Sequence, residues 1–441
     1  MKRGQTGICA LVAVDKPAGC SSHDVVSAVR RATGERRVGH AGTLDPFATG
    51  LLIVGIGPAT RLSNFVMDDF KEYAARIAFG CSTQTDDLSG EIAGDGLAEL
   101  STDDLCRLAD PEFARSVLDG FLGTQMQMPP AYSAKKIAGK KAYELAREGT
   151  EVELAATEVV VRVAELLHCG SGDASELDGS HSASVWSGEC SHGGLDVGFS
   201  DERMAGLPWW DVRFDVSKGT YIRALARDIG REVGCGAFLS RLRRLSLGSI
   251  GVADAVPFDD VEKLGDPDYL QSMSLDPCKV LGLSKHECTE EEIARIGNGA
   301  PLKVTLNQIE SFGENDPVGI PAQICMVSSG RMLAVYEAER ADEAQRSARA
   351  EHEKSRRVHG RGVSERRLLA EGQPEPLRYT PTAHPGRRST AEEPERRLPP
   401  DEQPVHMASA SHDHTDGSSA RTQAIRYKSK LVIPGGAIGV E

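Results

Sequence analysis

Residues 39–52 read Gly39-His40-Ala41-Gly42-Thr43-Leu44-Asp45-Pro46-Phe47-Ala48-Thr49-Gly50-Leu51-Leu52. The stretch Gly39 to Gly50 is predicted to be a loop, because its glycines permit tight turns and Pro46 restrains the backbone next to Asp45. The apolar residues from Leu51 to Val54 would anchor this loop as the start of a strand or a helix. Such a loop would hold one carboxylate rigidly at a surface, although Asp-Pro can also simply open a turn.

Outward from this loop, short apolar runs alternate with amphipathic segments from Ile8 to about Phe258, the pattern of an α/β or α+β domain. The apolar periodicity predicts two helices, Ser22 to Arg31 and Tyr221 to Val233. It also predicts strands at Ile8–Val14, Tyr73–Phe79, Val159–Val163 and Val212–Val216. Between the last two strands, Cys169 to Gly206 is rich in Gly, Ser, Asp and His, and we expect a long surface loop.

A second, mostly β unit is expected after Pro257. Thr289 is the predicted cap of a helix, and Ile324 to Tyr336 reads as a hairpin. Ala341 to Ala420 contains no Ile, Phe or Trp and is predicted to be disordered. The strand pattern resumes at Ala424 to Pro434 and could pair back with the hairpin. We therefore expect domains at 1–260, with the 169–206 loop, and at 275–441, interrupted by an insertion at 341–420.

The composition of the 441-residue chain limits the kinds of binding site and the cellular setting that we expect for the protein. With 51 Lys and Arg against 65 Asp and Glu, the net charge is −14, so any nucleic-acid site must be a local basic surface. The ten cysteines include no C-x-x-C pair, and we expect no histidine at zinc-ligand spacing beside them. Free thiols are therefore predicted. No stretch approaches the ~20 apolar residues of a transmembrane helix, and we expect a soluble, cytoplasmic protein.

Six motifs, in order, resemble the TruB family of tRNA pseudouridine-55 synthases. One is the 39–52 stretch and another is Gly219-Thr220-Tyr221-Ile222-Arg223. The remaining four are Lys16-Pro17-Ala18-Gly19-Cys20-Ser21-Ser22, Lys71-Glu72-Tyr73, Pro129 to Lys136 with Tyr143 to Arg147, and Leu242-Arg243-Arg244-Leu245. The resemblance implies an α+β fold: a pseudouridine synthase catalytic domain with a mixed central sheet, and a small, mostly β, PUA-like C-terminal domain.

The resemblance also implies the roles of individual residues. Asp45 would be the catalytic aspartate, Arg223 its partner, and Tyr73 the aromatic that stacks on the target base. Tyr221 and Leu242 would border the same pocket, and Asp87 would support Arg223. Lys16 and Pro17 would contribute to substrate binding, and Lys135, Lys136 and Arg147 would belong to an arm that grips RNA. His40 would fill the space that the flipped uridine leaves, or alternatively act as a general acid or base.

The reaction implied is isomerisation of uridine 55 in the T arm of tRNA. It breaks the N1–C1′ bond and joins C5 to C1′, so no redox or metal cofactor is expected, and the carboxylate would act as a nucleophile or a base. The expected partner is tRNA alone, bound by a monomer without an obligate protein partner. Two alternatives remain: an RNA-guided relative that needs partner proteins, and a non-catalytic RNA-binding factor.

Basic residues fall in three clusters that could form one RNA-facing surface. They comprise Arg30, Arg31, Arg36 and Arg37; Lys135, Lys136, Lys140, Lys141 and Arg147; and Arg241, Arg243 and Arg244. On the Tyr221–Val233 helix, in contrast, Arg227 and Arg231 are expected to be solvated charges.

Overall fold

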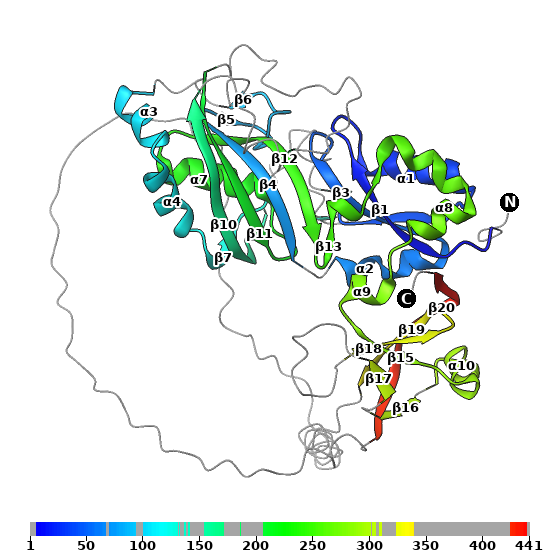
Figure 1. The fold of residues 1–441 in the computed structure, drawn as a ribbon. Coiled ribbons are helices and arrows are strands. Elements are labelled where there is room, and N and C mark those ends of the chain that lie inside the picture. The colour runs from blue at the N-terminus through cyan, green and yellow to red at the C-terminus, as the bar shows by residue number, and fades with distance from the viewer. Residues whose placement is uncertain are drawn as a thin grey trace, which may run out of the picture.

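The computed structural model describes residues 6–67, 70–93, 100–130, 132, 136–137, 140–141, 154–171, 186, 206–300, 302–305, 308–310, 323–338 and 424–438. Two main β-sheets organise these residues, a large sheet in the N-terminal part and a smaller one in the C-terminal part (Figure 1). None of the helices in this part of the chain has both the length and the apolar character that crossing a membrane requires.

The large sheet has ten strands and mixed strand directions. Its members are β1 (Ala10–Lys16), β2 (Val38–Ala41), β3 (Thr49–Ile56), β4 (Lys71–Phe79), β7 (Gly123–Gln127), β10 (Thr157–Ser171), β11 (Pro208–Val216), β12 (Ala237–Leu247), β13 (Ile250–Gly251) and β14 (Val256–Pro257). The order is β14-β1-β3-β12-β4-β11-β10-β7, with β2 beside β3 and β13 beside β12. β1 is parallel to β14 and β12 to β3, whereas β4, β11, β10 and β7 are antiparallel neighbours. The expected mixed central sheet is therefore present.

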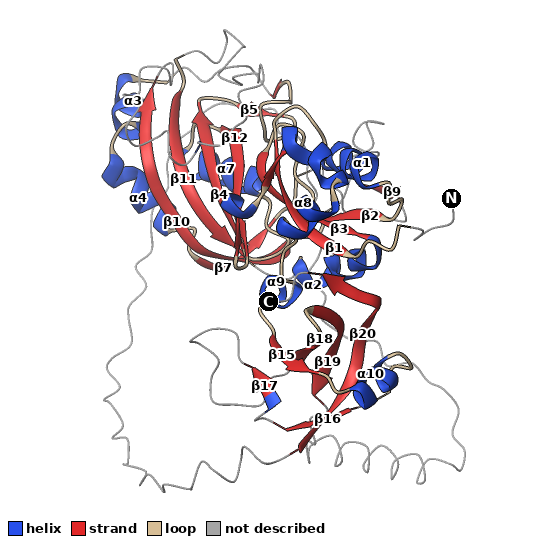
Figure 2. Cartoon of the chain, turned by 45° about the vertical axis from the view of Figure 1, so that its right-hand side comes forward, coloured by secondary structure: helices blue, strands red, loops and turns tan. Residues whose placement is uncertain are grey.

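Helices cover this sheet in two groups (Figures 1 and 2). Near β4, β10 and β11 lie α3 (Thr102–Leu108), α4 (Pro111–Asp119) and α7 (Ile222–Val233); beside β1 lie α1 (Ser22–Thr33), the 3-10 helix η5 (Phe258–Gly265) and α8 (Pro267–Ser272). The remaining short helices are η1 (Gly57–Leu62), α2 (Ser63–Val66), η4 (Val252–Asp254) and α9 (Pro277–Leu281). The predicted helices α1 and α7 are both confirmed. A capping box between Ser21 and Asp24 starts α1, and Gly34 ends it in the left-handed conformation.

Strands β1 and β3 are buried on both faces. On one face, side chains such as Val12 and Val54 pack in a core with α1 and η5. On the other, Leu11 and Ile53 pack in a core that also contains Cys325 from the smaller sheet. This double burial explains why these strands read as continuous apolar runs rather than alternating ones. It also joins the two sheets through a shared core.

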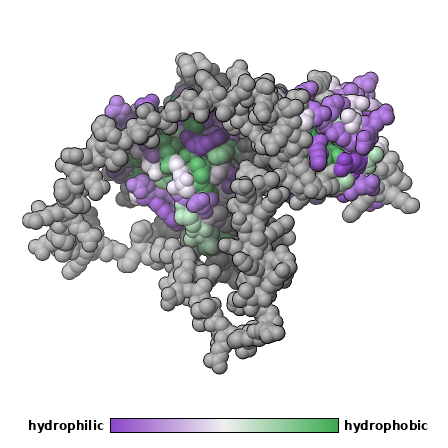
Figure 3. All heavy atoms as spheres, turned by 90° about the horizontal axis from the view of Figure 1, so that it is seen from below, coloured by the Kyte–Doolittle hydropathy of each residue, from purple (hydrophilic) through white to green (hydrophobic). Residues whose placement is uncertain are grey.

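The smaller sheet has six strands in the order β16-β20-β19-β18-β15-β17. They are β15 (Ser284–Glu287), β16 (Leu302–Thr305), β17 (Ile309–Glu310), β18 (Gln323–Ser328), β19 (Arg331–Ala338) and β20 (Ala424–Ile438), with α10 (Glu290–Ile296) beside them. The β18–β19 hairpin, the helix capped by Thr289 and the return of the 424–434 strand to pair with the hairpin are all confirmed. Seen from below, the described surface of the molecule shows both hydrophilic and hydrophobic residues (Figure 3).

Two boundaries differ from the sequence expectation. The Gly39–Gly50 segment is not wholly a loop, because β2 pairs with β3 through residue pairs such as His40 and Val54. Strand β10 continues to Ser171, into the segment expected to be a loop, because it stays paired with β11. The rest of that segment, apart from Trp186 and Gly206, and the whole 341–420 insertion lie outside the described residues. Two further strand pairs complete the fold: β5 (Ser82–Thr83) with β6 (Ile92–Ala93), and β8 (Lys136–Ile137) with β9 (Lys140–Lys141).

Candidate active site

Asp45 lies between β2 and β3, on a loop that is held from the start of α1. The hydroxyl of Ser22, a buried residue, donates a hydrogen bond to the Leu44 carbonyl at 3.0 Å and accepts one from the Leu44 amide at 2.9 Å. The Ala48 amide donates to the Asp45 carbonyl at 3.1 Å and closes the turn. The residue before Asp45 is thus fixed on both its backbone groups, while the Asp45 side chain stays 35% exposed.

Lys16 holds the other side of Asp45. Its ammonium group, fully buried at the end of β1, donates to the carbonyls of Pro17, Cys20 and Pro46 at 2.8, 2.7 and 3.2 Å. The Gly19 amide also donates to the Pro46 carbonyl, at 2.9 Å. Burial lowers the pKa of Lys16 to about 8. Lys16 and Pro17 were expected to bind substrate, but the Lys16 side chain has no exposed surface. Its ammonium group instead ties the segment after β1 to the Asp45 loop.

Arg223, in the first turn of α7, reaches Asp45 with two guanidinium nitrogens. Nε lies 2.9 Å from Oδ2 of Asp45, and Nη2 lies 3.3 Å from Oδ1. Nη1 donates to the Thr85 carbonyl at 2.9 Å, Nη2 donates to the Tyr132 carbonyl at 3.0 Å, and Nε lies 3.5 Å from Oδ2 of Asp87. The Arg223 side chain is only 7% exposed. A planar guanidinium held at this many points sets the orientation of the Asp45 carboxylate.

Asp87 is positioned to hold Arg223. Its Oδ1 accepts hydrogen bonds from the Thr85 hydroxyl at 2.6 Å and the Ser89 amide at 2.9 Å, which leaves Oδ2 toward the guanidinium. Burial raises the pKa of Asp87, opposed by the Thr85 hydrogen bond and the Arg223 charge. Among the described residues, the one group of three side chains with metal-ligand chemistry includes neither Asp45 nor Asp87.

Arg227 corrects a sequence expectation, because it is not a solvated helix charge. It is 6% exposed, and Nη1 lies 3.1 Å from Oδ2 of Asp86. Nη2 donates to the Met128 carbonyl at 2.8 Å. Arg231, one turn further, has a 57% exposed side chain, as expected. Arg223 and Arg227 stand four residues apart on one helix face, opposite Asp87 and Asp86. Residues four apart on a helix lie on the same face, so the position of Arg227 one turn after Arg223 was a signal in the sequence that Arg227 also faces an acidic partner.

The expected pocket side chains come from β4, β12 and the start of α7. Tyr73, on β4, is 8% exposed and belongs to the same core cluster as Leu44 and Ala48. Leu242, on β12, is part of that cluster as well. Tyr221 is half-buried and precedes α7 directly, two residues before Arg223. Chain segments that are distant in sequence therefore converge around the Asp45 loop.

His40 lies on β2, a few residues before Asp45. Burial lowers its pKa, and the charges of Arg244 and His23 act in the same direction. Its Nδ1 is buried and has no hydrogen-bond partner among the described residues. These effects favour the neutral form of the imidazole.

Two of the three arginines in the third basic cluster, Arg243 and Arg244, are buried in the sheet. Arg243 and Arg244 are each 1% exposed. Arg243 forms a two-point ion pair with Asp15, at 2.7 and 3.0 Å. Arg244 donates to the carbonyls of Leu51 and Gly42, at 2.7 and 3.0 Å. Both side chains join β12 to β1, β3 and the Asp45 loop, so the expectation that Arg243 and Arg244 face RNA is wrong. Arg241 is half-buried, with its guanidinium 4.2 Å from the ring centre of Trp186.

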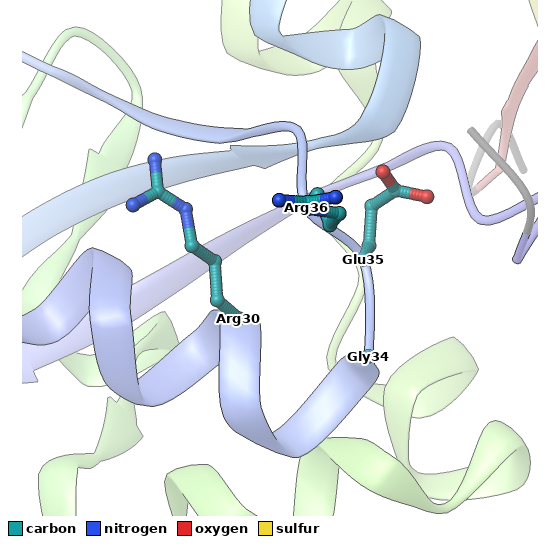
Figure 4. Close-up of a pocket in the computed structure, with 4 residues that line it drawn as sticks. All are labelled: Arg30, Gly34, Glu35 and Arg36. Carbon is teal, nitrogen blue, oxygen red and sulfur yellow. The ribbon is translucent and has the colours of Figure 1, made fainter. Parts of the chain in front are cut away.

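The first basic cluster borders a pocket of about 470 Å³ at the end of α1 (Figure 4). Arg30 and Gly34 come from the end of the helix, and Glu35 and Arg36 from the segment that follows. Arg36 is exposed, whereas Arg30 donates to the Val38 carbonyl at 2.9 Å. In the second cluster, Lys136 lies in β8, and Lys135 and Arg147 lie outside the described residues.

Comparisons with known proteins agree on one family. Residues 30–184 match the model for the N-terminal domain of TruB family pseudouridylate synthase, and residues 223–277 match that for the C-terminal domain of tRNA pseudouridylate synthase B. The tRNA pseudouridine synthase B of Thermosipho melanesiensis is 35% identical over 328 residues, which cover 74% of this chain and 90% of that protein. The enzyme of the same name from Desulfotalea psychrophila is 43% identical over 255 residues, covering 57% of this chain and 87% of that protein.

Among solved structures, one described as a Cbf5-Nop10-Gar1 complex matches with a TM-score of 0.48 and 21% identity, over 75% of this chain and 78% of that one. The family matches and the relatives together include the loop of Asp45, the strand of Tyr73 and the helix of Arg223. The chain belongs to the TruB family of pseudouridylate synthases.

Proposed function

We propose that this protein isomerises uridine to pseudouridine at position 55 in the T arm of tRNAs, with Asp45 as the catalytic carboxylate. The observation that carries the proposal is the two-point contact between Arg223 and Asp45, at 2.9 and 3.3 Å, on a loop held from both sides. The family relationship supports the reaction class, since the relatives are named tRNA pseudouridine synthase B.

The geometry suits a reaction that starts at the ribose or the base of one nucleotide. The Asp45 side chain is 35% exposed, so a substrate can reach it, while Arg223 behind it is buried. An ionised carboxylate in this position can attack as a nucleophile or remove a ribose proton. Arg223 stabilises the charge and aims the oxygens, and Asp87 in turn positions Arg223. The exchange of an N–C for a C–C bond requires no redox equivalents.

The target base must leave its stack before Asp45 can reach the sugar. Tyr73 and Tyr221 would stack on the extruded uracil, with Leu242 packing at the pocket wall; stacking on an aromatic ring contributes about 1–3 kcal/mol per base. The neutral His40 would occupy the space that the base vacates. Lys135, Lys136 and Arg147 would grip the RNA backbone, and the PUA-like domain would add a second RNA contact. We propose a cytoplasmic monomer that recognises tRNA without a partner protein.

Release of tritium from C5-labelled uridine in an unmodified tRNA transcript tests the assignment. The wild-type protein should release tritium, and Asp45→Asn should lower the rate by about 10²–10⁴-fold or more. Arg223→Gln should lower it strongly, while Arg231→Gln, on the exposed side of the same helix, should not. Absence of release by the wild type, with tRNA still bound, would refute the proposal and favour a guided enzyme or an RNA-binding factor.

A further inference from the structure

A second cluster of reactive side chains lies in the C-terminal domain, where β15 leads into α10. His286 is on β15, Cys288 follows that strand, and Glu292 is in the first turn of α10. His286 and Cys288 are 2% and 9% exposed. Nε2 or Nδ1 of the histidine, Sγ of the cysteine and a carboxylate oxygen all lie within 4.8 Å of one another. The sequence analysis expected no histidine at zinc-ligand spacing beside a cysteine, yet the fold brings His286 and Cys288 together.

The local fold brings these three side chains together. His286 and Cys288 are two residues apart along an extended segment, so their side chains point to the same side. The Cys288 amide donates to the Val327 carbonyl of β18 at 2.8 Å and extends the pairing past the end of β15. Thr289 then caps α10, and the helix turn returns Glu292 to the histidine.

The hydrogen bonds of His286 leave one nitrogen facing an acceptor. Nδ1 lies 3.1 Å from the Gln308 carbonyl oxygen, which only accepts, so Nδ1 carries the hydrogen. In a neutral imidazole, Nε2 then presents a lone pair to Oε2 of Glu292, 3.2 Å away, which when ionised also only accepts. Either a second proton or a cation must lie between these two atoms. An Nδ1–H bonded to a backbone carbonyl is the usual arrangement of a histidine that ligates metal through Nε2.

Cys288 bears on whether a proton or a metal ion lies between Nε2 of His286 and the Glu292 carboxylate. Without a metal ion, the Cys288 thiol donates a hydrogen bond to the His286 carbonyl at 3.7 Å and makes no contact with the proton between His286 and Glu292. A borderline-soft cation, in contrast, prefers nitrogen and sulfur ligands, and all three side chains can then bind it. Zinc bonds of about 2.0–2.3 Å in a tetrahedral arrangement place ligand atoms about 3.3–3.7 Å apart. The nitrogen–oxygen distance of 3.2 Å already fits this value. Bringing all three atoms into range requires a movement of about 1 Å.

We propose that His286, Cys288 and Glu292 bind one Zn²⁺ ion. His286 supplies Nε2, Glu292 supplies a carboxylate oxygen, and Cys288 supplies its sulfur after release of the thiol proton to solvent. Water completes the four-coordinate shell. The Glu292 carboxylate is oriented by hydrogen bonds from the amide and hydroxyl of Thr289, at 2.9 and 3.1 Å, as outer-shell partners orient ligands at established sites. The ion stabilises the junction of β15 and α10 and takes no part in chemistry at Asp45.

Cobalt provides a direct test, because Co²⁺ replaces zinc and its bond to a thiolate gives a charge-transfer band in the near ultraviolet. The full-length protein, freed of metal with a chelator, is titrated with Co²⁺ and then with Zn²⁺. We expect one equivalent of Co²⁺ to give the thiolate band and Zn²⁺ to abolish it. Cys288→Ser should lose the band, and Glu292→Gln, which keeps an oxygen for Thr289, should weaken cobalt binding at least tenfold.

Cys106→Ser is the matched control, since Cys106 is an exposed cysteine on α3 in the other domain. This variant should retain the band. A thermal melt gives a second readout: Zn²⁺ should raise the melting temperature of the wild type and of Cys106→Ser, but not that of Cys288→Ser. A wild-type protein without the band, or a band that survives in Cys288→Ser, would overturn the proposal and leave His286 and Glu292 as an ion pair.

Discussion

Replacing Ser22 with alanine should separate the support of the Asp45 loop from the chemistry of Asp45. The Ser22 hydroxyl is buried and makes reciprocal hydrogen bonds with the amide and carbonyl of Leu44, at 2.9 and 3.0 Å. In Ser22→Ala both backbone groups lose their partner in a buried setting. An unsatisfied buried group costs about 1–3 kcal/mol, so the free energy of unfolding should fall by about 2–6 kcal/mol.

Activity should fall as well, because Leu44 directly precedes Asp45. A displacement of about 1 Å of a reacting group lowers a rate by about 10²-fold. We therefore expect Ser22→Ala to release tritium from C5-labelled tRNA about 10²-fold more slowly at saturating substrate. The measurement is made at a temperature where urea unfolding shows that the variant is folded, so that the loss lies in kcat.

Ser21→Ala is the control for helix stability alone. The Ser21 hydroxyl caps α1 through Asp24, with bonds at 2.7 and 3.2 Å, whereas the hydrogen bonds to Leu44 come from Ser22. Loss of such a cap costs about 0.5–2 kcal/mol. This variant should be less stable but keep the wild-type kcat. An unchanged kcat in Ser22→Ala, or an equal loss of kcat in Ser21→Ala, would refute the reasoning.

Three further outcomes follow from buried groups near the site. The pKa of Lys16 is about 8 in the folded protein and about 10.4 in the unfolded chain, so the unfolded state binds more protons between these pH values. The free energy of unfolding, measured with urea, should therefore rise by about 3 kcal/mol from about pH 8 to about pH 10.4 in the wild type. It should rise less in Lys16→Met. Arg227→Met should lower the free energy of unfolding by about 3–5 kcal/mol in the same assay, because it leaves Asp86 buried and unpaired. The double variant with Asp86→Asn should recover part of this loss. A change under about 0.5 kcal/mol in Arg227→Met would instead mean that the arginine is solvated. Gly50→Ala would place Cβ 2.2 Å from the Arg244 carbonyl oxygen and should fail to fold by circular dichroism, whereas Gly282→Ala, also at positive φ but with open space, should fold.

The elements that the sequence predicted correctly depend on local periodicity. Helices α1 and α7 have one apolar stripe each, and α1 carries a capping signal beside it. Strand β20 alternates in the usual way, so its return to the hairpin was predictable across the long insertion. The glycine-rich segment before Asp45 was not, because β2 has weak strand propensity of its own and forms by pairing with β3.

The charged residues were harder to interpret, since a sequence shows a charge without its partner. Arg243 pairs with Asp15, which is 228 residues away, and Arg227 with Asp86, which is 141 residues away. Both arginines therefore read as surface charges until the sheet is assembled. The pairing of Asp45 with Arg223 spans 178 residues and was found only through the family resemblance. The grouping of His286 with Glu292 required the turn between β15 and α10.

The order of strands in the smaller sheet has a consequence for the integrity of the chain. Strand β20 lies between β16 and β19, yet residues 339–423 separate it from β19 in sequence. The pairs from Arg331 with Ile438 to Ala338 with Tyr427 hold it in place without any need for the covalent connection. A single cut within 339–423 should therefore yield two fragments that copurify as a folded complex. The C-terminal peptide should also restore a protein truncated after Ala338 when added in trans, which makes this domain a natural split-protein pair.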